Sequence, residues 1–225
     1  GVIFTDLLGE SGEDEMLARL RRAGIHCVVY GNSPLWHGYD RVASDQSRGC
    51  GMLTRHLINQ GCRRILCFWH RWQDYPWLVG RRKGYGRAME SAGLEPLPMA
   101  ERPASPEGTP DREAFLHAAR TLAGFLAEHL TGDAPVDAIL AASDGEVPYL
   151  TAACRLLNRI PGEDILIAGY DNYWEDAPER RYEPAPPAAT VDKRNAAMGA
   201  ELVRLLADRV EGRLPDAPQL RLVEP

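Results

Sequence analysis

The chain has 225 residues, of which 44% are hydrophobic and 26% are charged, and its formal net charge is -6. This length suits one large domain or two small ones with a real hydrophobic core. The acidic balance argues against direct contact of these residues with a nucleic-acid backbone, and no apolar run forms a secretion signal or approaches the ~20 residues of a membrane span.

Strand-like and helix-like patterns alternate along almost the whole chain, which is typical of an α/β fold. Apolar runs predict buried strands at 2–5, 25–31, 41–45, 64–69, 136–142, 164–170 and 219–225, with a short extended piece at 189–191. Amphipathic runs, several of them closed by glycine, predict helices at 13–23, 46–60, 77–92, 111–130, 146–158 and 195–211. Residues 97–110 and 172–187 are predicted to be loops. Because the strands are continuous apolar runs, parallel sheets covered on both faces are expected.

Polar or aromatic residues follow nearly every predicted strand. They are Asp6, Asn32, Asp45, residues 70–77, Ser143 with Asp144, and Asp171 with Asn172. Ligands bind beyond the carboxyl ends of the strands in open parallel sheets, so a binding site is expected where these residues meet. Structural interpretations stay open beside this one: Asp45 can cap the following helix, and Asp171 can form an Asx-turn.

The run from Phe68 to Trp77 is rich in aromatic residues directly after a strand. Trp72 and Trp77 could stack on the apolar face of a sugar or a base, or they could instead form an apolar cluster that fixes the loop. His70 has no second His or Cys at a metal-ligand spacing, so no metal site is expected.

Three consecutive basic residues, Arg81, Arg82 and Lys83, lie on the predicted helix at 77–92. They are about 100° apart around the helix axis, so they cannot all point the same way. The core-facing stripe consists of Leu78, Tyr85, Met89 and Ala92. Arg81 lies along that stripe and is expected to reach Asp45, Asp171 and a ligand, whereas Arg82 and Lys83 are expected to face solvent.

Catalytic and cofactor motifs are missing from the sequence. The Gly-x-Gly of residues 49–51 has Thr54 where a dinucleotide fingerprint needs its third glycine, and neither a phosphate-binding loop nor a Gly-x-Ser-x-Gly turn occurs. Nothing singles out an acid and nucleophile pair among the carboxylates. The five cysteines form no Cys-x-x-Cys pair and are interpreted as reduced packing residues in a cytoplasmic protein. We therefore expect a binding protein without cofactor, not an enzyme.

The sequence resembles the effector-binding core of LacI/GalR-family transcriptional regulators, which is related in fold to periplasmic sugar-binding proteins. The runs that carry the resemblance agree in order and spacing from Gly1 to about Leu206. They are "GVIFT", "LRRAGIHCVVYGN", "YDRVASDQSRGCGMLTRHLINQGCRRIL", "GRRKGYGRAMESAGL", "DAILAASD", "IPGEDILIAGYDN", "PPAATV" and "MGAELVRLL".

The resemblance implies two Rossmann-like subdomains with parallel sheets, of the periplasmic-binding-protein-like type I, around a ligand cleft. The N-terminal subdomain is expected to comprise 1–44 and 193–216 and to lack its first two strand–helix units. The C-terminal subdomain is expected to comprise 45–192 and 217–225. The chain is accordingly expected to be a fragment, truncated at both ends, of a longer regulator.

The family's ligand-contacting positions correspond here to Asp45, Arg81, Ser143, Asp171 and Lys193. Two of them depart from the family pattern, because Ser143 stands where Asn is usual and Lys193 where Gln is common. The resemblance thus implies a ligand site whose details differ from those of its relatives.

The function implied by the resemblance is that of a cytoplasmic homodimer whose core binds a small-molecule effector, most simply a sugar. Ligand-driven closure of the subdomains would control operator affinity through an N-terminal helix-turn-helix that this chain does not contain. The alternative is a periplasmic solute-binding protein of a sugar transporter, with the same fold but secreted. Sequence upstream of the chain would discriminate the two, since one carries a helix-turn-helix and the other a signal peptide.

Overall fold

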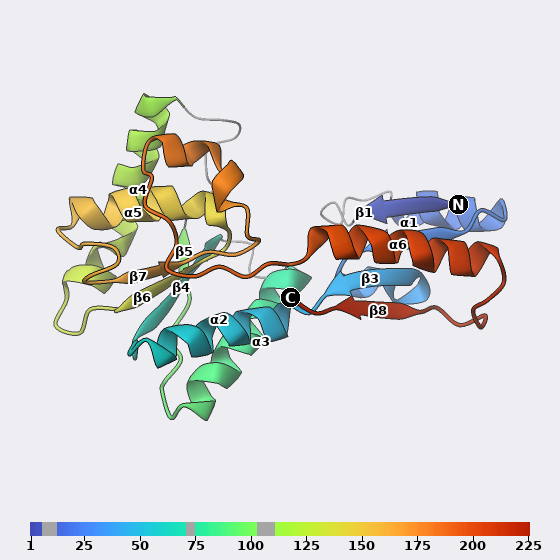
Figure 1. Cartoon of the computed structure of the whole chain (residues 1–225), viewed down its shortest axis with the longest axis horizontal. Helices are drawn as coiled ribbons and strands as arrows, with labels where there is room; N and C mark the ends of the chain where they lie inside the picture. The colour runs from blue at the N-terminus through green and yellow to red at the C-terminus, as the bar shows by residue number, and fades with distance from the viewer. Residues whose placement is uncertain (6–12, 71–74, 103–110) are drawn as a thin grey trace.

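The computed structural model describes residues 1–5, 13–70, 75–102 and 111–225. They form two four-stranded parallel sheets, with strand orders β1-β2-β3-β8 and β5-β4-β6-β7. Each sheet carries its own helices, and the chain passes between the two groups of elements (Figure 1). The expected α/β fold with parallel sheets in two subdomains is confirmed.

The first sheet contains β1 (Val2–Thr5), β2 (Cys27–Tyr30), β3 (Asp40–Ser44) and β8 (Leu220–Val223). One face packs on helix α6 (Asn195–Val210), where Val28 and Val42 contact Leu202 and Leu205. The other face packs on helix α1 (Glu13–Arg22) and the short helix η1 (Pro34–Gly38). Val28 and its neighbour Val29 point to opposite faces, as the period of two in a strand requires.

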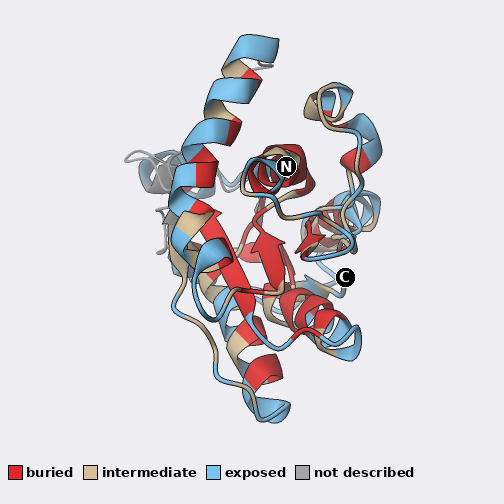
Figure 2. Cartoon of the chain, turned by 90° about the vertical axis from the view of Figure 1, so that its left-hand side faces the viewer, coloured by how far each residue is buried: buried red, intermediate tan, exposed pale blue. Residues whose placement is uncertain are grey.

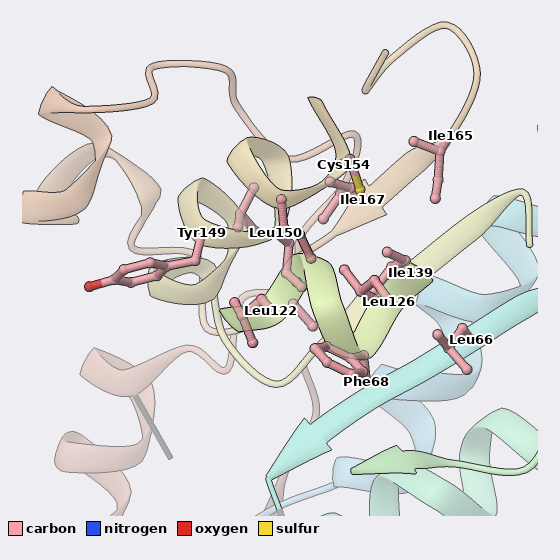
Figure 3. Close-up of a cluster of buried hydrophobic side chains, with 14 of the residues drawn as sticks. Leu66, Phe68, Leu122, Leu126, Ile139, Tyr149, Leu150, Cys154, Ile165 and Ile167 are labelled. Atoms are coloured by element: carbon pink, nitrogen blue, oxygen red, sulfur yellow. The ribbon is translucent and has the colours of Figure 1, made fainter. Parts of the chain in front are cut away.

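The second sheet contains β4 (Ile65–His70), β5 (Ala100–Arg102), β6 (Ala138–Ala141) and β7 (Leu166–Ala168). Helices α4 (Arg112–Thr131) and α5 (Val147–Leu156) cover one face, around a cluster that includes Phe68, Leu126 and Ile139 (Figure 3). Helices α2 (Gln46–Asn59) and α3 (Pro76–Ser91) cover the other face. The strands are buried between helices whose outer sides are exposed (Figure 2). The apolar character of these strands follows from burial on both faces.

Two features of the fold differ from the sequence-based expectation. Strand β5 lies within 97–110, which was expected to be a loop, and β8 pairs with β3, with Leu222 opposite Ala43. The assignment of 217–225 to the C-terminal subdomain is therefore wrong. The physical reason is that Arg209 on α6 donates to the Asp40 carboxylate and to the Pro215 and Ala217 carbonyls, which folds the α6–β8 connection back onto the first sheet.

Four of the cysteines have the packing role expected from the sequence. Cys50, Cys62 and Cys67 belong to the apolar cluster under α2 and α3, and Cys154 belongs to the cluster under α4 and α5. Burial raises the pKa of Cys50 to about 11, so this thiol stays protonated at neutral pH. In the described part of the chain, no helix is long and apolar enough to cross a membrane.

Helices α2 and α3 approach closely because glycines line their contact. A Cβ added at Gly84 would overlap the carbonyl oxygen of Ser47, and one added at Gly80 would lie 3.0 Å from Cβ of Gln46. Gly86, on the same helix, has nothing within 4 Å of an added Cβ. Gly80 and Gly84 thus serve helix packing, which brings Gln46 next to the start of α3.

Replacing Gly84 by Ala is expected to lower the free energy of unfolding by about 2 kcal/mol, because the backbone oxygen of Ser47 cannot move without shifting α2. The matched control is Gly86→Ala, which is expected to raise stability by about 0.5–1 kcal/mol through helix propensity alone. Urea unfolding followed by circular dichroism measures both changes. Equal stability of the two variants would contradict the close packing of α2 on α3.

Candidate functional site

A cavity of about 330 Å³ lies between the two sheets, at the carboxyl ends of their strands. Its lining combines residues of the first subdomain, which contains the sheet β1-β2-β3-β8, of the second subdomain, which contains the sheet β5-β4-β6-β7, and of the segments that join them. The lining residues are Tyr30, Gly31, Asn32, Gln46, Trp77, Arg81, Ala142, Ser143, Glu146, Asp171 and Lys193. The expectation of a site at the strand ends therefore agrees with where the structure has a cavity.

Arg81 is the most constrained cation of this cavity, with only 3% of its surface exposed. Its Nε donates to Oε1 of Gln46 at 2.8 Å, and one terminal nitrogen donates to the Ala142 carbonyl at 2.5 Å. The other terminal nitrogen lies 3.4 Å from Oδ1 of Asp171. Every edge of the guanidinium thus has an acceptor, which a buried charge requires.

The carbon of the same guanidinium lies over two aromatic rings. This carbon lies 3.5 Å from the ring centre of Tyr170 and 4.7 Å from that of Trp77. Trp77 in turn stacks on Tyr75, with ring centres 6.1 Å apart. These two cation–π contacts help to hold the guanidinium in place. Arg81 is therefore positioned before any ligand arrives.

The burial predicted for the three basic residues is found, whereas the ligand contact of Arg81 stays a prediction. Arg81 is buried in the cavity wall, whereas Arg82 and Lys83 are exposed. The pairing with Asp171 is found, but the acceptor expected from Asp45 is Gln46 instead. The carboxylate of Asp45 accepts from the backbone N–H of Arg48 at 2.9 Å and so caps α2. Asp45 is not among the residues that line the cavity.

Asp171 lines the cavity, but the N–H of Tyr173, which an Asx-turn would direct at its carboxylate, donates to Asp144 instead. The φ of Asp171 is 90° and that of Asn172 is 53°, in the left-handed region that Asp and Asn tolerate better than most residues. Oδ1 of Asp171 also lies 3.1 Å from Nζ of Lys193, and each of these two side chains is 19% exposed. One carboxylate is therefore shared by two cations at the edge of the cavity.

Ser143 lines the cavity next to a fully buried acid. Its hydroxyl accepts a hydrogen bond from the Tyr173 hydroxyl at 3.3 Å, and burial raises the pKa of Tyr173. Behind it, Asp144 is 0% exposed and accepts from the backbone N–H groups of Tyr173 and Trp174 and from the Thr190 hydroxyl. Asp144 thus joins the loop after β7 and the extended segment at 190 to the end of β6.

A glycine requirement follows from the position of this acid. A Cβ on Gly169 would overlap Oδ1 of Asp144, so the glycine of "GYD" leaves room for the carboxylate. Burial raises the pKa of Asp144 above its ordinary value, although the hydrogen bonds from Thr190, Tyr173 and Trp174 oppose this effect.

Several lining residues were not predicted from the sequence. Gln46 directly follows Asp45, and Glu146 follows Ser143 by one helical turn. Their closeness in the sequence to predicted site residues could therefore have identified them as lining residues. Glu146 is 5% exposed, and its Oε2 accepts from the backbone N–H of Ala142 at 3.1 Å. Trp77 lies in the cavity wall, whereas Trp72 lies outside the described residues.

Metal-ligating side chains do not gather in this cavity. Across the residues described by the structure, no group of three or more His, Cys, Asp or Glu side chains could hold a metal ion. The cavity offers paired charges, hydroxyl and amide groups and the aromatic rings of Tyr30 and Trp77, which suit recognition of a polar molecule with an apolar face.

Comparison with known proteins relates this geometry to one family. Residues 54–225 match the periplasmic binding protein-like domain. The HTH-type transcriptional regulator CelR of Thermobifida fusca is 31% identical over 223 residues, which cover 96% of this chain and 59% of CelR. The chain thus spans about three fifths of the length of that curated relative.

Solved structures agree in fold. The CelR–cellobiose complex superimposes with a TM-score of 0.71 at 26% identity, covering 100% of this chain and 63% of that one. A regulatory protein of the LacI family from Chloroflexus aggregans gives a TM-score of 0.74 at 26% identity, covering 99% and 73%. A LacI-family regulator of Enterococcus faecium with bound ribose is 18% identical, with a TM-score of 0.73 and coverage of 99% and 76%, and shows the fold alone.

Asp144→Ala is expected to lower the free energy of unfolding by about 3 kcal/mol, because it leaves three donors without their acceptor. Asp144→Asn is the control: it keeps an oxygen for the two backbone N–H groups, and its amide can donate to Thr190.

Because the folded state raises the pKa of Asp144, it binds protons more readily than the unfolded state. The stability contributed by this group is therefore present at low pH and lost as pH rises through the raised pKa. Urea unfolding between about pH 4 and pH 7 measures the free energy of unfolding of wild type and of Asp144→Asn. As pH rises, wild type is expected to lose stability relative to the Asn variant. A constant difference between the two proteins would contradict the burial of a charge.

Proposed function

We propose that this chain forms the effector-binding core of a LacI-type transcriptional regulator. The chain belongs to the family of periplasmic binding protein-like domains, and the proposal proceeds from that membership. In this proposal a small saccharide is the effector and occupies the cavity between the two sheets. Binding, not catalysis, is its role, in line with the relatives named as transcriptional regulators.

The observation that carries the proposal is the composition of the cavity wall. Tyr30 and Asn32 come from the first subdomain, whereas Trp77, Arg81 and Asp171 come from the second. A ligand that touches both sets stabilises the arrangement in which they are close together. By linkage, a ligand shifts a conformational equilibrium only through such a difference in affinity between the two states.

The chemistry of the wall supports a saccharide. Ring hydroxyls of a sugar bind charged, hydroxyl and amide side chains, and its apolar face stacks on an indole ring such as Trp77. A volume of about 330 Å³ lies at the small end of the range of ligand cavities. The CelR structure was solved as its cellobiose complex, which makes cellobiose the first saccharide to try.

Within this proposal, Arg81, Ser143, Asp171, Trp77 and Lys193 contact the ligand. The family resemblance also implies Asp45 as a ligand contact. Asp45 caps α2 and is proposed to act from the rim of the cavity. Trp72, which lies outside the described residues, stays a sequence-based prediction of a ligand contact.

The output of the proposed regulator is operator affinity. Closure of the subdomains would change how a DNA-binding domain, attached N-terminally in the whole protein, holds its operator. The chain would act as a cytoplasmic homodimer, because two-fold symmetry of the protein matches that of a palindromic operator.

The second candidate is a solute-binding protein of a sugar transporter, secreted to the periplasm. The 31% identity to a helix-turn-helix regulator across nearly the whole chain favours the first candidate. The coding sequence upstream of Gly1 discriminates the two, since a helix-turn-helix supports the regulator and a signal peptide supports the transporter protein.

Arg81→Ala is expected to weaken cellobiose binding at least tenfold, because several charge-assisted hydrogen bonds, each worth about 1.5–3 kcal/mol, are lost with the guanidinium. Arg81→Lys is not expected to restore affinity, since an ammonium group cannot reach three acceptors in one plane. Titration calorimetry measures the dissociation constants, and circular dichroism verifies folding.

The matched control is Lys83→Ala, two residues along the same helix and exposed, which is expected to bind like wild type. Equal losses in both alanine variants would contradict the role of Arg81. If the wild-type chain binds neither cellobiose nor any other neutral mono- or disaccharide of a panel, the saccharide proposal itself is wrong.

A further inference from the structure

The chain crosses between its two subdomains at segments that border the cavity. The first crossing leaves β3 at Ser44 and enters α2, which packs on α3 of the second subdomain (Figure 1). A later crossing leaves the second subdomain after Val191, whose carbonyl accepts from the N–H of Asp171, and enters α6 of the first subdomain. Rotation of one subdomain against the other has to bend the backbone at these segments.

Four side chains connect these two crossings through the cavity wall. Gln46 is the first residue of α2 after the first crossing, and it accepts from Arg81 at 2.8 Å. Arg81 contacts Asp171 at 3.4 Å, and Asp171 contacts Lys193, on the later crossing, at 3.1 Å. We infer that the row Gln46–Arg81–Asp171–Lys193 couples the two crossings. Gln46 is a positioning residue at one end of the row, and Lys193, a proposed ligand contact, is the other end through which an occupant of the cavity sets the hinge. The part of this inference that concerns an occupant rests on the proposed function.

The row transmits a displacement because its centre is rigid. Arg81 is buried and lies over the rings of Trp77 and Tyr170, so a shift of its guanidinium at Asp171 also changes its contact with Gln46. Asp171 is shared by Arg81 and Lys193, so a ligand hydroxyl that binds this carboxylate competes with one of the two cations.

The backbone beside Lys193 is suited to respond to such a change. Arg194 has a φ of 57°, in the left-handed region that is costly for a residue other than glycine. Its N–H donates to the Asp192 carboxylate at 2.6 Å, and α6 begins at the next residue. A loss of the Lys193 contact therefore acts where the backbone is already strained.

Amide hydrogen exchange by NMR on the full 225-residue chain without ligand tests the coupling. The reporters are the amide of Gly49, bonded to the Asp45 carbonyl at the first crossing, and the amide of Asp171, bonded to the Val191 carbonyl at the later crossing. Gln46→Leu and Lys193→Met each remove one end of the row. Each variant is expected to speed exchange at both reporters by about threefold or more, in keeping with couplings through packed networks.

The controls separate coupling from local loosening. Lys83→Met, on the exposed side of α3, is expected to leave both amides unchanged, and Gln46→Glu, which keeps the acceptor oxygen, is expected to retain slow exchange at both. If each variant speeds exchange only at its own crossing, the inference is overturned. Titration of wild type with cellobiose and other saccharides tests the proposed function separately. If the chain binds no saccharide but the two reporters still respond together, the coupling is supported and the proposed function is wrong.

Discussion

The organisation of the cavity depends on one buried cation. A guanidinium that is 3% exposed must have acceptors along its edges, since an unpaired buried charge costs several kcal/mol. Arg81 obtains them from the start of α2, the end of β6 and the loop after β7. Satisfying this one side chain thus brings three segments far apart in sequence to a single point, where a ligand would meet them.

The glycine pattern and the buried acid serve the same arrangement. Gly80 and Gly84 allow α3 to approach α2 closely enough for Gln46 to reach Arg81. Asp144 ties the loop after β7 to the end of β6, which holds Asp171 and Ser143 in the same wall. The cavity is therefore shaped by helix packing and buried hydrogen bonds before any ligand is present, and pre-organisation of this kind lowers the entropic cost of binding.

The sequence was sufficient for whatever depends on local periodicity. It predicted the alternating elements, and it separated Arg81 from Arg82 and Lys83 because their angular positions on a helix are fixed. It could not predict that β8 returns to the first sheet, since this depends on Arg209 reaching Asp40 across 169 positions of the chain. Nor could it choose Gln46 over Asp45 as the acceptor for Arg81, because a carboxylate at a helix start is equally suited to capping.

We propose that a saccharide binds between the subdomains on the network around Arg81. The most direct test is a crystal structure of the chain with the saccharide that most raises its melting temperature. We expect ligand hydroxyls within hydrogen-bonding distance of Arg81 and Asp171, a sugar ring against Trp77, and contacts to Tyr30 or Asn32 of the first subdomain. A saccharide bound elsewhere, or held by the second subdomain alone, would contradict it.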